Sequence, residues 1–291
     1  MRRDIWRFLL TAMLIGALAL TAVAFPVTLI DDRGQEITID AQPERIVVVG
    51  ALYAQILVDL GVDGRIVAVA ESDDNPSEIS GLPSVGPAFS PSVETILGHD
   101  PDLVLGPTDW GGERPALEAA GVTVLSTPWI TDTSSIFDTL RTIGAAVGEA
   151  LASDLLVGRI AQDILAAELD VLGLEAIPAA FLYASSPTDP PYAAGSDAIE
   201  HELIMRAGGT NVFAELQWSP QVSFEEIIAR DPDVIFTAPS QIDNVLGNPL
   251  LAAVTAVVEG RVYGIEASLV TSTHVAEAFR LILDGLRADT P

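Results

Sequence analysis

One pattern of residues occurs twice in this chain, 131 positions apart, as measured from Glu94 to Glu225. Ser92–Leu105 and Ser223–Phe236 both follow the pattern S-x-E-x-I-[LI]-x-x-D-P-D-[LV]-[VI]. Each copy predicts a helix with a serine N-cap and an acid in its first turn, a stop at Asp-Pro, and then a short apolar strand. A duplicated helix-strand unit of this kind indicates that the chain builds two similar lobes.

The two glutamates of the repeat are candidates for a docking surface. Because Glu94 and Glu225 hold the same place in the two copies, we expect them to project from corresponding surfaces of the two lobes. Taken singly, each has a purely structural explanation, since an acid at a helix N-terminus gains about 0.3–1 kcal/mol from the helix dipole. Capping alone, however, accepts Asp, Ser or Thr in many arrangements, whereas here the whole string is repeated. We therefore interpret the pair as contacts for a two-fold partner.

The first 24 residues have the composition of a secretory signal peptide. Three arginines precede an apolar run from Phe8 to Ala24, which ends in the sequence Ala-Val-Ala. This order of basic region, apolar region and A-x-A site is typical of a cleaved signal, so the mature chain is expected to begin near Phe25. An uncleaved anchor is the alternative, because the run approaches the roughly 20 residues that span a bilayer. Both interpretations place the protein outside the cytoplasm, in a periplasm or tethered by its signal segment.

Composition excludes several classes of function. The chain contains no cysteine, which removes disulfides, thiolate metal sites, cysteine nucleophiles and lipid attachment at an N-terminal cysteine. Its formal net charge is −27, and removal of residues 1–24, with three arginines and one aspartate, changes that charge to −29. Such a surface repels nucleic acids and anionic lipids, so neither is an expected partner.

Strand and helix patterns alternate in both halves of the chain, which predicts α/β lobes with mostly parallel sheets. The predicted strands are Val27–Ile30, Glu36–Ile39, Ile46–Val49, Ile66–Val69, Leu103–Leu105, Val122–Leu125, Ala179–Tyr183, Val234–Phe236 and Val262–Ile265. The predicted helices are Leu52–Leu60, Val93–Gly98, Arg114–Ala120, Ser135–Val147, Ala198–Ala207, Phe224–Ala229, Leu250–Val257 and Val275–Leu286. Between the halves, apolar residues recur at helical spacing from Ala150 to Leu172 without a proline. We therefore divide the chain into a signal peptide (1–24), an N-terminal lobe (25–149), a long connecting helix (150–173) and a C-terminal lobe (174–291).

Aromatic side chains gather on the loops where a ligand is expected. In α/β sheets, ligands bind beyond the carboxyl ends of the strands. The loops expected there include Glu71–Ser90, Gly106–Gly112, Ser126–Asp132, Ser185–Gly195, Thr237–Asn244 and Glu266–His274. The rings on or beside them belong to Tyr53, Phe89, Trp110, Trp129, Tyr192 and Trp218. Packing against its own lobe is the simpler explanation for any one ring, but several rings converging on one cleft suit a large, flat, partly apolar ligand.

The sequence carries none of the common signatures of catalysis or of cofactor binding. No Walker loop, no G-x-G-x-x-G and no G-x-S-x-G occurs, and the three histidines are not in H-E-x-x-H spacing. We therefore predict no enzyme activity, no cofactor and no metal site. Two alternatives remain: an extracellular enzyme that uses Asp73, Asp74, Asp109 or Glu113 as acid or base, and a chelate sensor. No signalling module follows the last predicted helix, which disfavours the sensor.

Several motifs, taken in order, resemble the cobalamin and iron-siderophore class of ABC-transporter solute-binding proteins. They are PERIVVV at Pro43–Val49, LGVDGRI at Leu60–Ile66, both copies of the repeat, and GGTNV at Gly208–Val212, and together they extend over most of the chain. The resemblance implies two α/β lobes joined by one long helix, with a metal chelate bound between them. It also implies a monomer that delivers the chelate to a membrane permease, whose arginines meet Glu94 and Glu225.

Within that class, the cobalamin binders are most similar to this chain. Asp109–Arg114 and Trp218–Ser223 resemble their tryptophan-bearing loops, and Pro190–Tyr192 resembles an aromatic loop. Haem binders of the fold bring a ligating tyrosine from the loop after the second strand, and Glu71–Phe89 contains none. Arg114 is the one basic residue near a predicted cleft loop, where it would supply a polar contact. The resemblance therefore implies a neutral or weakly charged ligand, a corrinoid or a ferric siderophore, held by the six rings and Arg114.

Overall fold

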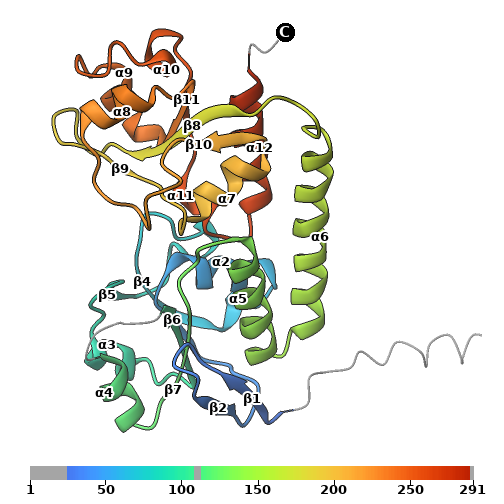
Figure 1. Cartoon of the computed structure of the whole chain (residues 1–291). Coiled ribbons are helices and arrows are strands. Elements are labelled where there is room, and N and C mark those ends of the chain that lie inside the picture. The colour runs from blue at the N-terminus through green and yellow to red at the C-terminus, as the bar shows by residue number, and fades with distance from the viewer. Residues whose placement is uncertain (1–24, 108–112, 289–291) are drawn as a thin grey trace, which may run out of the picture.

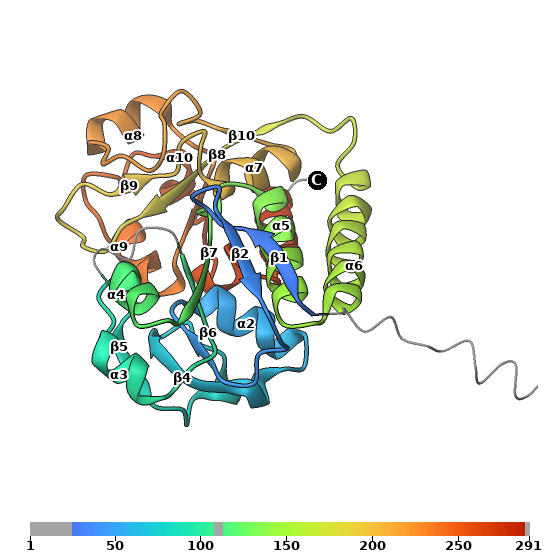
Figure 2. The same cartoon turned by 90° about the horizontal axis from the view of Figure 1, so that it is seen from below.

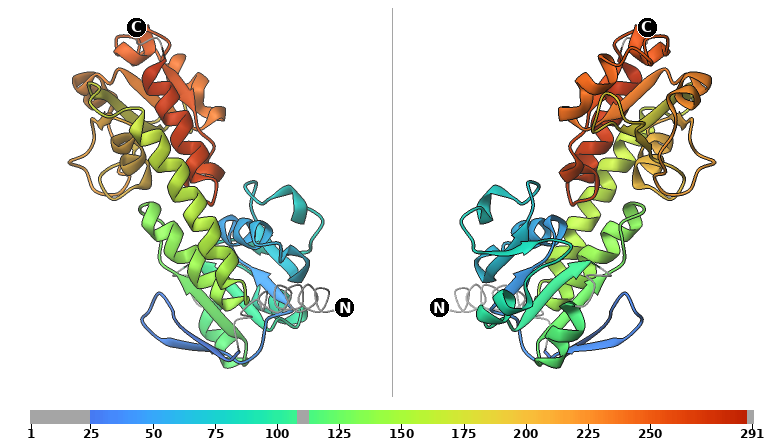
Figure 3. Two further views of the ribbon diagram at one scale, coloured as in Figure 1. Left: turned by 90° about the vertical axis from the view of Figure 1, so that its right-hand side faces the viewer. Right: turned by 90° about the vertical axis from the view of Figure 1, so that its left-hand side faces the viewer.

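The computed structural model describes residues 25–107 and 113–288, and these form two α/β lobes. The long helix α6 (Ala150–Leu169) lies beside both lobes and contacts α5 (Thr133–Ala146) of the first and α12 (Val275–Arg287) of the second (Figures 1 and 3). The predicted two-lobed α/β fold is confirmed. Within the described residues, no helix is both long enough and apolar enough to cross a lipid bilayer.

The N-terminal lobe is built on a five-stranded parallel sheet in the order β5-β4-β3-β6-β7. Its strands are β3 (Ile46–Val48), β4 (Ile66–Glu71), β5 (Ser84–Pro87), β6 (Leu103–Pro107) and β7 (Thr123–Thr127). The other helices of this lobe are α2 (Ala51–Asp59), α3 (Val93–Gly98) and α4 (Glu113–Ala119). The central strand β3 is buried along its whole length, because helices cover both faces of a parallel sheet. A hairpin of β1 (Val27–Ile30) and β2 (Glu36–Ile39) packs against β7 and α5 (Figure 2).

The C-terminal lobe is likewise built on a parallel sheet, with fewer parallel strands. Its parallel strands follow the order β10-β8-β11-β12, and β9 pairs antiparallel with β8. The strands are β8 (Ile177–Tyr183), β9 (Tyr192–Ala193), β10 (Gly209–Asn211), β11 (Val234–Thr237) and β12 (Val262–Gly264). The helices besides α12 are α7 (Ile199–Arg206), α8 (Phe224–Arg230), α9 (Ile242–Leu246), α10 (Thr255–Val258) and α11 (Ala267–Val270).

The two copies of the repeat fold alike, down to the backbone of single residues. Ser92 caps α3 by accepting a hydrogen bond from a backbone N–H at 3.2 Å, and Ser223 caps α8 in the same way, also at 3.2 Å. The first aspartate of each Asp-Pro-Asp segment is left-handed, with φ of 49° at Asp100 and 43° at Asp231. Asp and Asn tolerate this region better than other non-glycine residues. The repeated sequence therefore specifies a repeated helix, a repeated reversal and a repeated strand, β6 or β11.

The structure differs from the sequence-based prediction mainly at short elements. The predicted cleft loop Glu71–Ser90 contains the strand β5, which ends in Gly-Pro and pairs only with β4 at the sheet edge, where proline is tolerated. The predicted start of the helix Leu250–Val257 is wrong, since the helical residues are Thr255–Val258. Asp231 fixes the observed start, because it accepts hydrogen bonds from the backbone N–H and the hydroxyl of Thr255 at 2.7 and 3.0 Å. The short helix α11 lies within the predicted loop Glu266–His274, and α9 begins within the predicted loop Thr237–Asn244 and continues to Leu246.

Polar contacts and a shared core hold the two lobes together. Glu202 of α7 accepts hydrogen bonds from the backbone N–H and the hydroxyl of Thr133, the first residue of α5, at 2.6 and 2.7 Å. On another edge of the interface, the hydroxyl of Thr273 donates to Asp59 at the end of α2. One continuous apolar cluster includes Ile143 of the first lobe and Phe279 of the second. Because these contacts resist bending between the lobes, we expect only a small closing motion.

The candidate ligand cleft between the lobes

A first cavity, of about 350 Å³, lies where the parallel strands of the N-terminal sheet end. Its lining residues are Val49, Gly50, Ala51, Leu52, Tyr53, Ser72, Asp74, Ala88, Phe89, Pro107, Pro128, Trp129, Ile130 and Thr271. They follow or terminate β3, β4, β5, β6 and β7, and Thr271 comes from the C-terminal lobe. This is the edge at which α/β proteins bind ligands, because the strand ends and the following loops converge there.

Tyr53 forms part of the cavity wall, and a glycine makes room for it. Gly50 has φ of 128°, and a Cβ atom there would lie 3.2 Å from the Tyr53 ring. The Tyr53 hydroxyl shares a hydrogen bond of 2.9 Å with the hydroxyl of Thr127. Burial raises the pKa of Tyr53 well above its ordinary value, so the phenol stays neutral. Tyr53 therefore presents an uncharged aromatic wall to the cavity.

A second cavity, of about 390 Å³, continues the first into the C-terminal lobe. Its lining residues are Trp129, Ile130, Tyr183, Asp197, Ala198, Ile199, Glu200, Trp218, Ser219 and Thr271. Trp129, Ile130 and Thr271 line both cavities, so the two spaces form one cleft between the lobes. A single pocket that binds a drug-sized ligand has a volume of about 300–1,000 Å³. The cleft formed by the two joined cavities therefore accommodates a large molecule.

The aromatic walls of the cleft include large side chains that face solvent. Phe89 and Trp129 stack with their ring centroids 6.5 Å apart, and they are 77% and 47% exposed. Trp218 is 60% exposed and has φ of 59°, a conformation that is a clear outlier for a bulky residue. Its carbonyl oxygen accepts a 2.6 Å hydrogen bond from the Gly195 N–H, which holds that backbone in place. Exposed rings around a cavity are typical of a binding site for a partly apolar ligand.

The structure brings together four of the six predicted rings. Tyr53, Phe89, Trp129 and Trp218 line the cleft. Tyr192 is half-exposed on β9 and is not among the residues that line either cavity. Trp110 lies outside the described residues.

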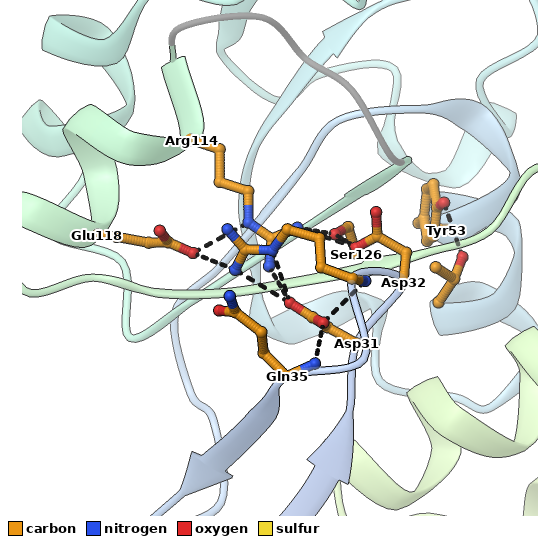
Figure 4. Close-up of polar contacts among 9 residues, drawn as sticks. Asp31, Asp32, Gln35, Tyr53, Arg114, Glu118 and Ser126 are labelled. Atoms are coloured by element: carbon orange, nitrogen blue, oxygen red, sulfur yellow. Dashed lines mark hydrogen bonds and ion pairs between the residues drawn. The ribbon is translucent and has the colours of Figure 1, made fainter.

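Arg114 occupies a buried cluster of charges and does not line the cleft (Figure 4). Its guanidinium, 6% exposed as a residue, donates to Asp31 at 2.5 Å, to Asp32 at 3.0 Å and to Glu118 at 3.0 Å. It also donates to the hydroxyl of Ser126. These contacts attach the first turn of α4 to the end of β1 and to β7. The sequence predicted that Arg114 contacts the ligand. In the structure Arg114 has a structural role instead, because carboxylates already engage its guanidinium donors.

Sequence reasoning named one polar residue of the cleft and missed others. Asp74, a candidate acid or base of the enzyme alternative, lines the first cavity with Ser72, and Tyr183, Asp197 and Glu200 line the second. A signal was available for Tyr183, which is the last residue of a predicted strand and so stands at the carboxyl edge of the sheet. Glu200 gave no signal, because an acid in the first turn of a helix has an ordinary explanation in the helix dipole.

Glu94 and Glu225 are both exposed and occupy the second residue of α3 and of α8. The two helices lie on different lobes and on the same side of the molecule, remote from α6 (Figures 1 and 2). Neither carboxylate is used as an N-cap, since Ser92 and Ser223 serve that purpose. The side chains are therefore available to an external partner.

Comparison with known proteins finds relatives that are similar to this chain in sequence. An ABC transporter substrate-binding lipoprotein of Bacillus subtilis is 26% identical over 275 residues, which are 91% of this chain and 87% of that protein. A cobalamin-binding protein of Halobacterium salinarum is 30% identical over 231 residues, 75% of this chain and 60% of the relative. This chain thus spans less than two thirds of the Halobacterium protein.

Solved structures show the same fold. An apo periplasmic heme-binding protein of Roseiflexus sp. RS-1 superposes with a TM-score of 0.75 and 26% identity, over 84% of this chain and 99% of that one. A protein of an ABC-type Fe3+-hydroxamate transport system from Saccharomonospora viridis gives a TM-score of 0.76 and 26% identity, over 90% and 99% of the two chains. The family model for periplasmic binding proteins matches residues 46–269. The chain therefore belongs to the periplasmic binding protein family.

Proposed function

We propose that this chain is the solute-binding component of an ABC importer and that it captures a metal chelate, either a corrinoid or a ferric siderophore. The observation that carries the proposal is the joined cleft between the lobes, walled by Tyr53, Phe89, Trp129 and Trp218. Flat aromatic walls suit the broad face of a chelate such as a corrinoid. The 30% identity to a cobalamin-binding protein makes a corrinoid our first choice.

We also propose that the protein catalyses no reaction and that it works outside the cytoplasm. The relatives include a substrate-binding lipoprotein and periplasmic binding proteins, which supports capture and delivery rather than turnover. We further propose that the protein works as a monomer, that residues 1–24 are its signal segment, and that residues 25–149 and 174–291 are its lobes. Glu94 and Glu225 are the proposed contacts with the permease. Detection of a chemically altered ligand after incubation would favour the enzyme alternative.

Titration of the purified protein tests the choice of ligand. We expect cyanocobalamin and cobinamide to quench the tryptophan fluorescence with a micromolar or lower Kd, because Trp129 and Trp218 line the cleft. Trp129→Ala and Trp218→Ala should each weaken binding about fivefold or more, since an aromatic contact in a desolvated site is worth about 1–3 kcal/mol. Tyr192→Ala, which removes an exposed ring outside both cavities, is the control and should leave the affinity unchanged.

Haem and the ferric trihydroxamate ferrichrome complete the panel. Binding of ferrichrome alone would retain capture of a chelate and replace the corrinoid as its ligand. Binding of haem alone would overturn the preference for a corrinoid or siderophore. A protein that is folded by circular dichroism and yet binds none of the four compounds would contradict the proposed function.

A further inference from the structure

A buried carboxyl group and a tyrosine form one wall of the second cavity. Tyr183 is the last residue of β8, Glu200 is the second residue of α7, and both line the cavity. Glu200 is only 5% exposed, and the Tyr183 hydroxyl donates a hydrogen bond to its Oε1 atom. In the described part of the chain, Tyr183 is the one side chain hydrogen-bonded to Glu200. The Oε2 atom of Glu200 is therefore not engaged by another of these side chains.

With Glu200 in its ionised form, the pair presents acceptors, rather than donors, to a ligand. The proton of the Tyr183 hydroxyl is committed to Glu200, so the phenol oxygen and the carboxylate oxygens offer lone pairs. Burial, followed by the negative charge of Glu200, raises the pKa of Tyr183, which keeps that proton in place. Burial also raises the pKa of Glu200, whereas the hydrogen bonds from the Tyr183 hydroxyl and from the backbone N–H of Glu200 itself favour the ionised carboxylate and oppose this shift.

The remaining charged groups of the cleft have the same sign. Asp197 lines the second cavity beside Glu200, and Asp74 lines the first. No arginine or histidine is among the described residues that line either cavity, and Arg114 is bound in its own cluster. A ligand that carries carboxylates would find no cationic partner among these described residues, and it would be repelled by Asp197 and by the ionised form of Glu200.

We propose that Tyr183 and Glu200 form an acceptor subsite that binds amide N–H, hydroxyl or ammonium groups at the edge of the chelate and excludes chelates edged with carboxylates. This inference rests on the proposed function and deepens it by naming the class of substituent that the cleft selects. A closed cleft leaves the acceptors without water, so a ligand without donors would leave them unsatisfied. Such a loss is larger than that of an apolar contact, and it makes buried polar groups strong determinants of specificity.

A matched pair of corrinoids tests the subsite. Dicyanocobinamide carries amides around the corrin ring, whereas dicyanocobyrinic acid carries carboxylates on the same ring. We expect the wild-type protein to bind the amide form at least about tenfold more tightly. In Glu200→Gln, the new carbonyl accepts from Tyr183 and the new amide donates to the cavity, so this preference should fall at least about tenfold. Asp163→Asn, which removes one negative charge from the exposed face of α6, should preserve the wild-type preference.

Tyr183→Phe supplies a second variant if Glu200→Gln fails to fold. This substitution removes the phenol oxygen as an acceptor and removes the hydroxyl that donates to Glu200. The ratio of the two Kd values, which measures the preference for the amide form, should therefore also decrease. Equal binding of both corrinoids by the wild-type protein, or an unchanged preference in both folded variants, would overturn the subsite while leaving capture of a corrinoid intact. If corrinoids do not bind but ferric hydroxamates do, ferrioxamine B and its N-succinyl derivative replace the pair, and the ammonium form should bind more tightly. Absence of binding by all of these probes contradicts the proposed function itself.

Discussion

A chain that carries both Glu94→Arg and Glu225→Arg is expected to bind its ligand as tightly as the wild-type protein and to support no uptake above background. Both glutamates are exposed on corresponding helices of the two lobes, and neither lines the cleft. In the proposed complex, reversal of both charges places like charges against basic groups of the permease, and like-charge contacts at an interface cost several kcal/mol. The measurement is uptake of labelled cyanocobalamin by cells that contain the cognate importer, with Kd determined in parallel on the purified chain.

The control for this experiment makes the same change of charge elsewhere. Asp163 of α6 and Asp170, the residue that follows this helix, are exposed. Helix α6 itself lies on the side of the molecule remote from α3 and α8 (Figure 1). Asp163→Arg with Asp170→Arg should therefore leave uptake near the wild-type rate. Each single reversal at Glu94 or Glu225 is expected to give partial uptake. Uptake by the Glu94/Glu225 double variant at the wild-type rate would remove these residues from the docking surface.

Arg114→Leu is expected to lower the free energy of unfolding by about 3–5 kcal/mol, because it removes the buried cation from a cluster of buried charges. Asp31 and Asp32 lie within 2.5 and 3.0 Å of the guanidinium. Asp31 and Glu118 retain Arg33, at 3.0 and 2.8 Å, so each of them loses one of two cationic partners. Arg141→Leu is the matched control, since Arg141 is about half-exposed and pairs with an exposed Asp154 at 3.1 Å. Its loss should cost less than about 1 kcal/mol in a denaturant titration.

The pH dependence of stability gives a second measurement of the charge cluster around Arg114. Burial alone would raise the pKa of Asp31, but hydrogen bonds from Gln35 and Arg33 and the charge of Arg114 hold it below the ordinary value. A lowered pKa in the folded state stabilises the fold above the unfolded-state pKa of about 4, and this contribution is lost as the pH falls below that value. The wild-type protein should therefore lose stability as the pH falls below about 4. Equal stability of Arg114→Leu and the wild-type protein at neutral pH would contradict the structural role of Arg114.

Local sequence patterns predicted most of the fold because the relevant forces act over short distances. At both copies of the repeat, the prediction rested on a capping serine, an Asp-Pro reversal and a buried apolar strand. Even the left-handed residues Asp100 and Asp231 occupy the same position in the two copies. The strand β5 could not be predicted, since Gly86 and Pro87 are tolerated there only because β5 lies at a sheet edge. The start of α10 depends on the carboxylate of Asp231, which is distant in the sequence.

The candidate site was predictable in its aromatic part and not in its charges. Rings that follow parallel strands must meet at one edge of the sheet, which placed Tyr53, Phe89 and Trp129 correctly beside the first cavity. Whether a charged residue faces the cleft depends on the direction of one side chain and on partners from distant segments. The Arg114 side chain points toward the end of β1, whereas the Glu200 side chain faces the second cavity. Neither orientation could be predicted from the neighbouring residues in the sequence.

The central claim is that a metal chelate binds in the cleft between the lobes. The most direct measurement is a crystal structure of the mature protein with cyanocobalamin, with diffraction recorded above the cobalt absorption edge. We predict one anomalous peak in the cleft between the two lobes, with the corrin ring in contact with Trp129 and Trp218. A cobalt peak outside the cleft, or crystals that take up no cobalt while another class of solute occupies the cleft, would contradict the account.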